Sequence, residues 1–289
     1  MTGLFVAKLN QVDFCYLDPE RGLLGESWWY DIVLYGELDD QGMIFDFGPA
    51  KKLIKQRLDE WVDHKLLLPM HHENVSINKS ASIGCCDPVQ DSALWQVDWA
   101  FAKADRLTTQ APASAFTELA TSEITPEAVA EAMVPRLMTE MPDNVTAIDL
   151  SFYNEPLNGA YYHYSHGLKK HQGNCQRIAH GHRSTIEIYR DGRRDAQLES
   201  LWAERFCDIH LITQEDLVQD AELRTVAYQA PQGRFELTLP ARCTYLMDQD
   251  TTVENIAAHI AKQCKANYPE STFRVRAFEG INKGAEVKS

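Results

Sequence analysis

The sequence has no long apolar run, no excess of basic residues and no regular spacing of cysteines. No stretch approaches the roughly 20 apolar residues that a membrane-spanning helix needs, and the opening Met-Thr-Gly-Leu-Phe lacks the basic flank of a signal peptide. The seven cysteines are odd in number, and the adjacent Cys85 and Cys86 are poorly placed to bridge each other. We therefore expect a cytoplasmic protein with reduced thiols and no membrane partner.

The charge balance argues against one class of partner. The 289 residues include 28 Lys and Arg against 42 Asp and Glu, a formal net charge of −14. Because binding a phosphate backbone requires a basic surface, the sequence predicts no nucleic-acid partner. With 44% hydrophobic and 24% charged residues, the composition is typical of a globular protein with one large domain or two of ordinary size.

A window from Tyr162 to Ile188 concentrates histidines around a cysteine. His180 and His182 are two residues apart, so both imidazoles would point to the same face of a strand. His166 lies one hairpin earlier and could fold back as a third ligand. Three imidazoles with an open fourth position are typical of a catalytic zinc site. A lone His-x-His is more often a surface accident, but the third histidine and the nearby Cys175 favour the metal site.

The order His-x-Leu, then Cys, then His-Gly-His leading into a strand resembles the family of 6-pyruvoyltetrahydropterin synthase and 6-carboxytetrahydropterin synthase, which have the tunnelling fold (T-fold). The resemblance implies that His166, His180 and His182 bind zinc. It also implies that Cys175 is the catalytic base, whose ionisation neighbouring positive charge would favour.

Further positions match the family's pterin-binding pattern. Thr251 and Thr252 precede a helix, and Glu279 follows the last strand. The resemblance implies that Glu279 is the leading pterin anchor and that the two threonines contribute to substrate binding. Glu155 follows a strand in the first half and matches the same carboxylate position.

The first half is similar to a degenerate copy of the second. It reads as strands over 5–16 and 28–38 and a helix after Gly48-Pro49, but Gly25-Glu26-Ser27-Trp28 stands where the zinc pair should fall. Asp63 and His64 close this helix, and the resemblance implies that such a pair assists the cysteine from a neighbouring subunit. In the second half the pair is split as Asp208-Ile209-His210, so the sequence leaves His64 or His210 as the partner of Cys175.

These patterns predict an α+β protein, a tandem T-fold with antiparallel sheets and helices on one face of each. We expect a degenerate copy over residues 1–160, without zinc ligands and with an insertion near 74–116, and a zinc-binding copy over 161–289. Such sheets leave exposed edges, so we expect them to close into a barrel in a homo-oligomer.

The activity that the resemblance implies is a zinc-dependent lyase converting 7,8-dihydroneopterin triphosphate to 6-carboxytetrahydropterin, a step toward queuosine. The pyruvoyl-forming reaction of 6-pyruvoyltetrahydropterin synthase stays open, as does a non-catalytic T-fold protein that binds a pterin or purine. A cupin-like His-x-His oxygenase would leave Cys175 unexplained. Since the chain is acidic overall, a triphosphate would need a local basic cluster such as Lys169, Lys170 and Arg177.

Overall fold

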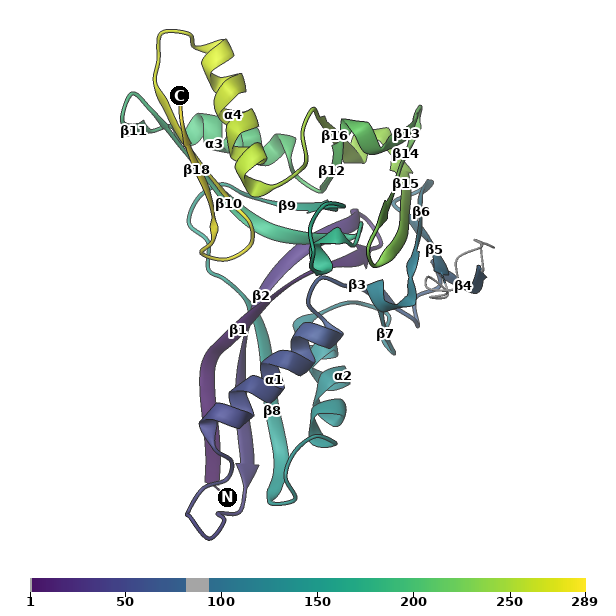
Figure 1. Ribbon diagram of the computed structural model, residues 1–289, viewed down its shortest axis with the longest axis vertical. Coiled ribbons are helices and arrows are strands. Elements are labelled where there is room, and N and C mark those ends of the chain that lie inside the picture. Colours follow the sequence, from purple (N-terminus) through teal and green to yellow (C-terminus); the bar gives the residue numbers. More distant parts are fainter. Residues whose placement is uncertain (1, 82–93) are drawn as a thin grey trace.

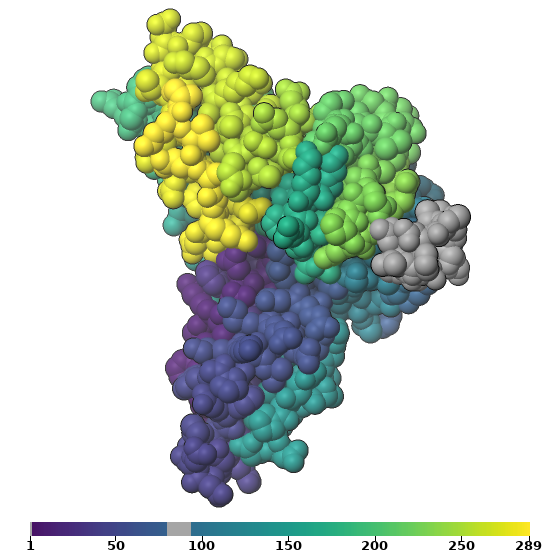
Figure 2. All heavy atoms as spheres, viewed as in Figure 1, coloured from purple at the N-terminus to yellow at the C-terminus, as the bar shows by residue number. Residues whose placement is uncertain are grey.

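The computed structural model describes residues 2–81 and 94–289, and Cys85 and Cys86 lie outside them. The two halves of the chain occupy opposite ends of an elongated molecule (Figures 1 and 2). Each end has a sheet with two helices, and a third sheet lies beside the middle (Figure 1). The predicted α+β class is therefore confirmed. Within the described residues, no helix is long and apolar enough to cross a membrane.

The N-terminal half forms a five-stranded sheet that packs against two helices. Alternate residues of one strand, Tyr30, Ile32 and Leu34, are buried in the core that also holds Ile54 and Met133 of the helices, as expected for a sheet with one covered face. In spatial order the strands are β7 (Phe116–Leu119), β3 (Leu66–Pro69), β1 (Thr2–Asp18), β2 (Gly22–Gly36) and β8 (Val145–Asn154), and the helices are α1 (Phe47–Trp61) and α2 (Pro126–Met138).

The C-terminal half repeats this arrangement. Helix α4 begins at Val253 and is capped by Thr252, whose side chain accepts from the amide of Asn255. The strand order is β16 (Thr244–Met247), β12 (Ile209–Thr213), β9 (Tyr161–His166), β10 (His180–Arg190), β17 (Phe273–Phe278) and β18 (Gly284–Lys288), with β11 (Arg193–Arg194) beside β10 and with helices α3 (Ala196–Arg205) and α4 (Val253–Asn267).

The sheets are antiparallel in their centre but mixed at one side. The hairpins β1–β2 and β9–β10 are antiparallel, and β8 and β17 continue them antiparallel. On the other side, β3 pairs parallel with β1 and with β7, and β12 pairs parallel with β9 and with β16. A parallel neighbour needs a crossover, and the segments that contain α1 and α3 supply it for the pairs β1–β3 and β9–β12. Closure into a barrel by other chains stays a prediction.

The segment 74–116 has a counterpart in the second half. Three strands from each half form one six-stranded sheet, and the halves meet where β6 pairs antiparallel with β15, as at Thr109 and Leu237. The strands in order are β13 (Leu217–Asp220), β14 (Leu223–Ala230), β15 (Gly233–Pro240), β6 (Asp105–Pro112), β5 (Leu94–Phe101) and β4 (Val75–Ala81). The sequence did not show this repeat, because its pairing joins distant segments. The predicted boundary at residue 160 stays a prediction.

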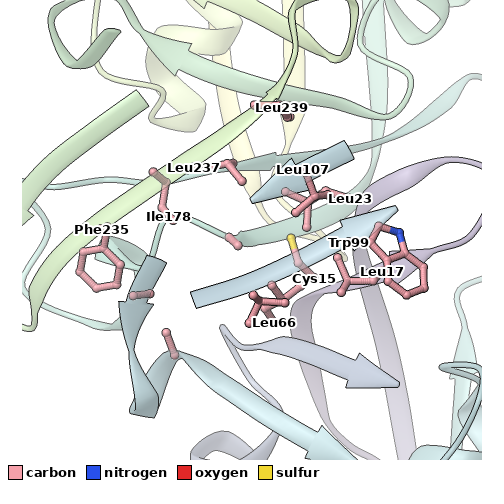
Figure 3. Close-up of a cluster of buried hydrophobic side chains, with 14 of the residues drawn as sticks. Cys15, Leu17, Leu23, Leu66, Trp99, Leu107, Ile178, Phe235, Leu237 and Leu239 are labelled. Carbon is pink, nitrogen blue, oxygen red and sulfur yellow. The ribbon is translucent and has the colours of Figure 1, made fainter. Parts of the chain in front are cut away.

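A shared hydrophobic cluster binds the two halves together (Figure 3). Cys15, Leu23 and Leu66 of the first half are buried in the same cluster as Ile178 and Phe235 of the second. At about 25 cal/mol for each Å² of apolar surface removed from water, such a cluster strongly disfavours separation of the halves. The two halves therefore form one packed unit.

The two long hairpins cross at a pair of glycines. Gly25 on β2 and Gly181 on β10 approach so closely that a Cβ on Gly181 would lie 2.7 Å from Cα of Gly25. The sequence predicts the second strand over 28–38, but β2 begins at Gly22 and already includes Gly25. This crossing brings side chains of β1 next to the histidines of β10.

Candidate active site

Three histidines of the second half converge in the interior beside this crossing. His166 ends β9 and pairs in register with His180 at the start of β10, and His182 follows on the same face. All three side chains are buried, and one nitrogen from each lies within 4.8 Å of the others. The Nε2 atoms of His166 and His182 are 3.3 Å apart. The structure thus brings together the three ligands that the sequence predicts.

The other ring nitrogens fix the orientation of these imidazoles. Nδ1 of His166 donates to the carbonyl of Thr251 at 2.8 Å, and Nδ1 of His180 donates to the carbonyl of Arg177 at 2.8 Å. Burial is the main cause that lowers the pKa of both histidines well below the ordinary value, so both are neutral near pH 7. Nε2 of His180 is buried and has no hydrogen-bond partner among the described residues. Neutral imidazoles with Nδ1 satisfied and Nε2 free form a donor set that fits zinc.

Asp13 of β1 supplies the partner for the third histidine. One of its carboxylate oxygens lies 3.3 Å from Nδ1 of His182, which has no better acceptor among the described residues. The buried carboxylate also accepts from Ser27 Oγ at 2.5 Å and from Lys283 Nζ at 2.9 Å. Burial alone would raise the pKa of Asp13, but its interactions with His182 and Lys283 outweigh it and lower the pKa below its usual range. The first half therefore places a carboxylate behind a histidine of the second.

Asp13 is not among the site residues that the sequence patterns predict. Its one signal is a carboxylate inside a strand otherwise rich in apolar residues, Val12-Asp13-Phe14. Such a residue is rarely buried unless it is paired, but its partners lie far along the chain.

The Asp13→Asn substitution should weaken zinc binding. An amide has the size of the carboxylate but not its charge, so His182 loses its anionic partner, and loss of such a partner typically costs about 10–100-fold in metal affinity. Competition against a chromophoric chelator measures the change. Asp149→Asn, at an exposed carboxylate of β8, is the control and should bind zinc normally. Equal zinc affinity of the two variants would show that Asp13 does not support zinc binding by His182.

Cys175 lies beside the histidines and contacts His64 of the first half. Its Sγ is 3.4 Å from Nε2 of His64, whose Nδ1 is 2.5 Å from the carboxylate of Asp63. His64 adopts φ 53° directly after α1, and its amide donates to the carbonyl of Asp13. Burial lowers the pKa of His64, but the hydrogen bonds to Asp63 and Cys175 outweigh it and raise the pKa to about 10. A continuous series of polar contacts thus crosses between the two halves, from Asp63 through His64 to Cys175.

The turn after α3 in the second half corresponds to the turn that holds His64, but His210 does not take the place of His64 there. Asp208 has φ 58° and donates its amide to the carbonyl of His163, so it takes the place that His64 has in the first half. Its carboxylate forms an ion pair with Arg21. His210 is buried two residues further on, with Nδ1 2.9 Å from the hydroxyl of Ser165. Within the described residues, Cys175 therefore contacts His64 rather than His210.

The register of the two hairpins also identifies what replaces the zinc ligands in the first half. Tyr16 pairs with Leu24, and Phe14 with Glu26, as His166 pairs with His180, and Tyr164 with His182. Tyr16, Leu24 and Glu26 therefore stand at the three histidine positions, slightly offset from the predicted Gly25–Trp28 gap. Burial is the main cause that raises the pKa of Glu26 to about 7. A tyrosine, a leucine and one carboxylate do not form a zinc donor set.

Among the residues expected to bind substrate, Glu279 reaches the histidines. Its carboxylate lies 3.7 Å from Nε2 of His182 and 4.0 Å from Nε2 of His166. Thr251 is buried against His166, and Thr252 caps α4. Glu155 follows β8, where its carbonyl accepts from Arg183. The roles of these four residues in binding stay predictions.

The expected basic cluster is largely neutralised by its neighbours. Lys169 forms ion pairs with Glu215 and Asp216, and Lys170 pairs with Asp250. Arg177 instead donates to the carbonyl of His64 at 3.1 Å, and burial is the main cause that lowers its pKa to about 10. Of the three, Arg177 is the cation next to the Cys175–His64 contact.

Comparisons with known proteins identify the family. The sequence profile described as 6-pyruvoyl tetrahydropterin synthase matches twice, over residues 15–164 and 160–289. A Methanocaldococcus jannaschii protein, provisionally named a 6-carboxy-5,6,7,8-tetrahydropterin synthase, is 46% identical over 59 residues, which are 20% of this chain and 36% of that protein. The match thus spans about a third of this relative's length.

Solved structures of 6-pyruvoyltetrahydropterin synthase were also found. The Plasmodium vivax enzyme is 15% identical with a TM-score of 0.41, covering 54% of this chain and 93% of its own. The Plasmodium falciparum enzyme is 14% identical with a TM-score of 0.42, covering 54% and 92%. The two profile matches together span nearly the whole sequence and confirm the predicted duplication. The chain therefore belongs to the 6-pyruvoyl tetrahydropterin synthase family and carries two copies of the family's domain in tandem.

Proposed function

We propose that this pterin synthase is a zinc-dependent lyase that converts 7,8-dihydroneopterin triphosphate to 6-carboxytetrahydropterin or a closely related pterin. The observation that carries the proposal is the contact of Cys175 with His64, placed beside three converging imidazoles. A non-catalytic protein that only binds a pterin or purine would have no need of a thiol in contact with an oriented imidazole.

His166, His180 and His182 would hold the zinc. When bound there, the ion would polarise hydroxyl groups of the substrate's side chain and acidify the neighbouring C–H bonds. Glu279, on the same side of the histidines, would accept from the N–H edge of the pterin, because two parallel donors match the two oxygens of a carboxylate.

Proton transfer falls to the Cys175–His64–Asp63 chain. Asp63 holds His64 through Nδ1, so Nε2 faces the sulfur. A positively charged imidazole stabilises a neighbouring thiolate, and a thiolate is the form that accepts a proton. Cys175 would take the proton from substrate carbon, and His64 would hold or return it. Arg177 adds positive charge beside this pair.

Incubation of the zinc-loaded protein with 7,8-dihydroneopterin triphosphate tests the proposal. We expect 6-carboxytetrahydropterin, identified by mass spectrometry together with release of triphosphate. A pyruvoyl product would assign the chain to the alternative reaction of the family. Tight binding of the pterin with no product would instead support a non-catalytic pterin-binding protein.

Metal analysis should give one zinc per chain after dialysis. The second half has the complete donor set, whereas Tyr16, Leu24 and Glu26 replace it in the first half. His182→Ala should lose the ion, because two imidazoles hold zinc poorly. The exposed His71→Ala is the control and should retain it. Two ions per chain, or full occupancy of the His182 variant, would contradict the assigned ligands.

The Glu279→Gln substitution should raise the KM for the pterin substrate by about 10–100-fold, since a hydrogen bond to a charged group typically contributes about 1.5–3 kcal/mol. Steady-state kinetics measure the change, with zinc content checked in parallel. Glu270→Gln, at an exposed carboxylate after α4, is the control. An unchanged KM with normal zinc content would exclude Glu279 as the anchor.

A further inference from the structure

A second set of metal-binding atoms overlaps the three histidines. One nitrogen each of His64 and His180 and Sγ of Cys175 lie within 4.8 Å of one another, close enough for one cation to reach all three. The sulfur and Nε2 of His64 are already 3.4 Å apart. This His–Cys–His set joins both halves of the chain, and it shares His180 with the three-histidine set.

Both imidazoles of the His–Cys–His set are oriented as metal ligands. Asp63 binds Nδ1 of His64, and the carbonyl of Arg177 binds Nδ1 of His180, so each ring is left with Nε2 for a cation. A carboxylate or carbonyl on the outer nitrogen is the usual support of a ligating histidine. His64 and Cys175 are only partly buried, which leaves an ion a path to them.

The two sets exclude each other. Nδ1 of His180 is engaged by Arg177, so His180 offers a single lone pair, and a cation bound by one set deprives the other of its third ligand. The sets also differ in softness, because only the His–Cys–His set includes a sulfur. Thiolate ligands select soft cations, whereas imidazoles suit zinc. The negative charge of a thiolate also offsets the repulsion that a cation would meet from Arg177.

We propose that His64, Cys175 and His180 form a distinct position for a thiophilic cation such as Cd²⁺, which competes with zinc in the three-histidine set. Binding there displaces the proton that His64 and Cys175 share, releases it to solvent, and occupies the lone pairs of both residues. Its effect on turnover rests on the proposed function, in which these two residues transfer the proton, but the binding itself does not.

The test is titration of the metal-free protein with Cd²⁺. We expect one ion per chain, an ultraviolet charge-transfer band from thiolate to cadmium, and protection of Cys175 from alkylation by iodoacetamide. His166→Ala should keep the cadmium band while losing zinc, because His166 belongs only to the three-histidine set. Cys175→Ser and His64→Gln should lose the band, and Cys207→Ser, at an exposed cysteine, should keep it.

Several results would overturn the proposal. These are no thiolate band in the unaltered protein, a band of full intensity in Cys175→Ser or His64→Gln, and loss of cadmium by His166→Ala that stays folded by circular dichroism. If His166→Ala does not fold, His166→Gln is used in its place. Failure of the zinc protein to turn over the pterin would defeat the proposed function alone, because the band and the alkylation do not depend on catalysis.

Discussion

Cys175→Ala should lower kcat by about 10²–10⁴-fold, the usual contribution of a general base, while zinc content and pterin binding stay nearly unchanged. The sulfur contacts His64, and Cys175 is not among the three histidines expected to bind zinc. Its loss should therefore remove proton transfer and leave the metal bound. Single-turnover kinetics and zinc analysis measure the two properties separately. Cys207→Ala is the matched control and should keep full activity.

His64→Ala should cause a loss of similar size, and the double variant with Cys175→Ala should be hardly worse than either, because residues that act as a unit are not additive. Since one chain provides both residues, mixing the two single variants should not restore activity. Unchanged kcat in Cys175→Ala would exclude the sulfur as the base. An active His64→Ala together with an inactive His210→Ala would show that the first half plays no part in proton transfer.

Gly25→Ala should destabilise the protein by at least about 3 kcal/mol, at or above the usual range for overpacking of a core. Its Cβ would lie 1.9 Å from the carbonyl oxygen of Tyr164 and 2.4 Å from the amide nitrogen of His182. Both are backbone atoms, so no rotation of a side chain can relieve the clash. The strands must separate, and Asp13 must then move away from His182.

Urea denaturation followed by circular dichroism measures this effect. Gly48→Ala is the matched control, because a Cβ there would lie an ordinary 3.5 Å from the Asp46 carboxylate. Alanine in place of glycine within α1 should leave stability unchanged or slightly raised. Equal stability of the two variants would show that the crossing can open without cost.

The sequence carries much of the fold because its signals are local. Alternation predicts the strands around Tyr30 and Ile188, and the Thr-rich start before α4 predicts a helix, although the cap is Thr252. His180 and His182 were found in the same way, since the two-residue period of a strand fixes their common face. Those features need no knowledge of distant segments.

The features that the sequence did not show depend on distant contacts. The carboxylate of Asp13 faces His182 only because two hairpins cross at Gly25 and Gly181. The left-handed residue after each helix fixes which positions of the two halves correspond, and Asp208, rather than His210, is the left-handed residue that corresponds to His64. The sequence does not show this, because an aspartate alone does not reveal a left-handed φ. The pairing of β6 with β15 likewise joins strands from different halves.

Because the two halves share a hydrophobic core and a sheet, the contact between His64 and Cys175 forms within a single polypeptide. Where such groups come from separate subunits, dilution can part them, and the fraction of complete sites then falls with protein concentration. A covalent chain instead presents one group to the other at a fixed effective concentration. The contact between His64 and Cys175 is therefore independent of protein concentration, and every folded polypeptide contains both residues of the pair.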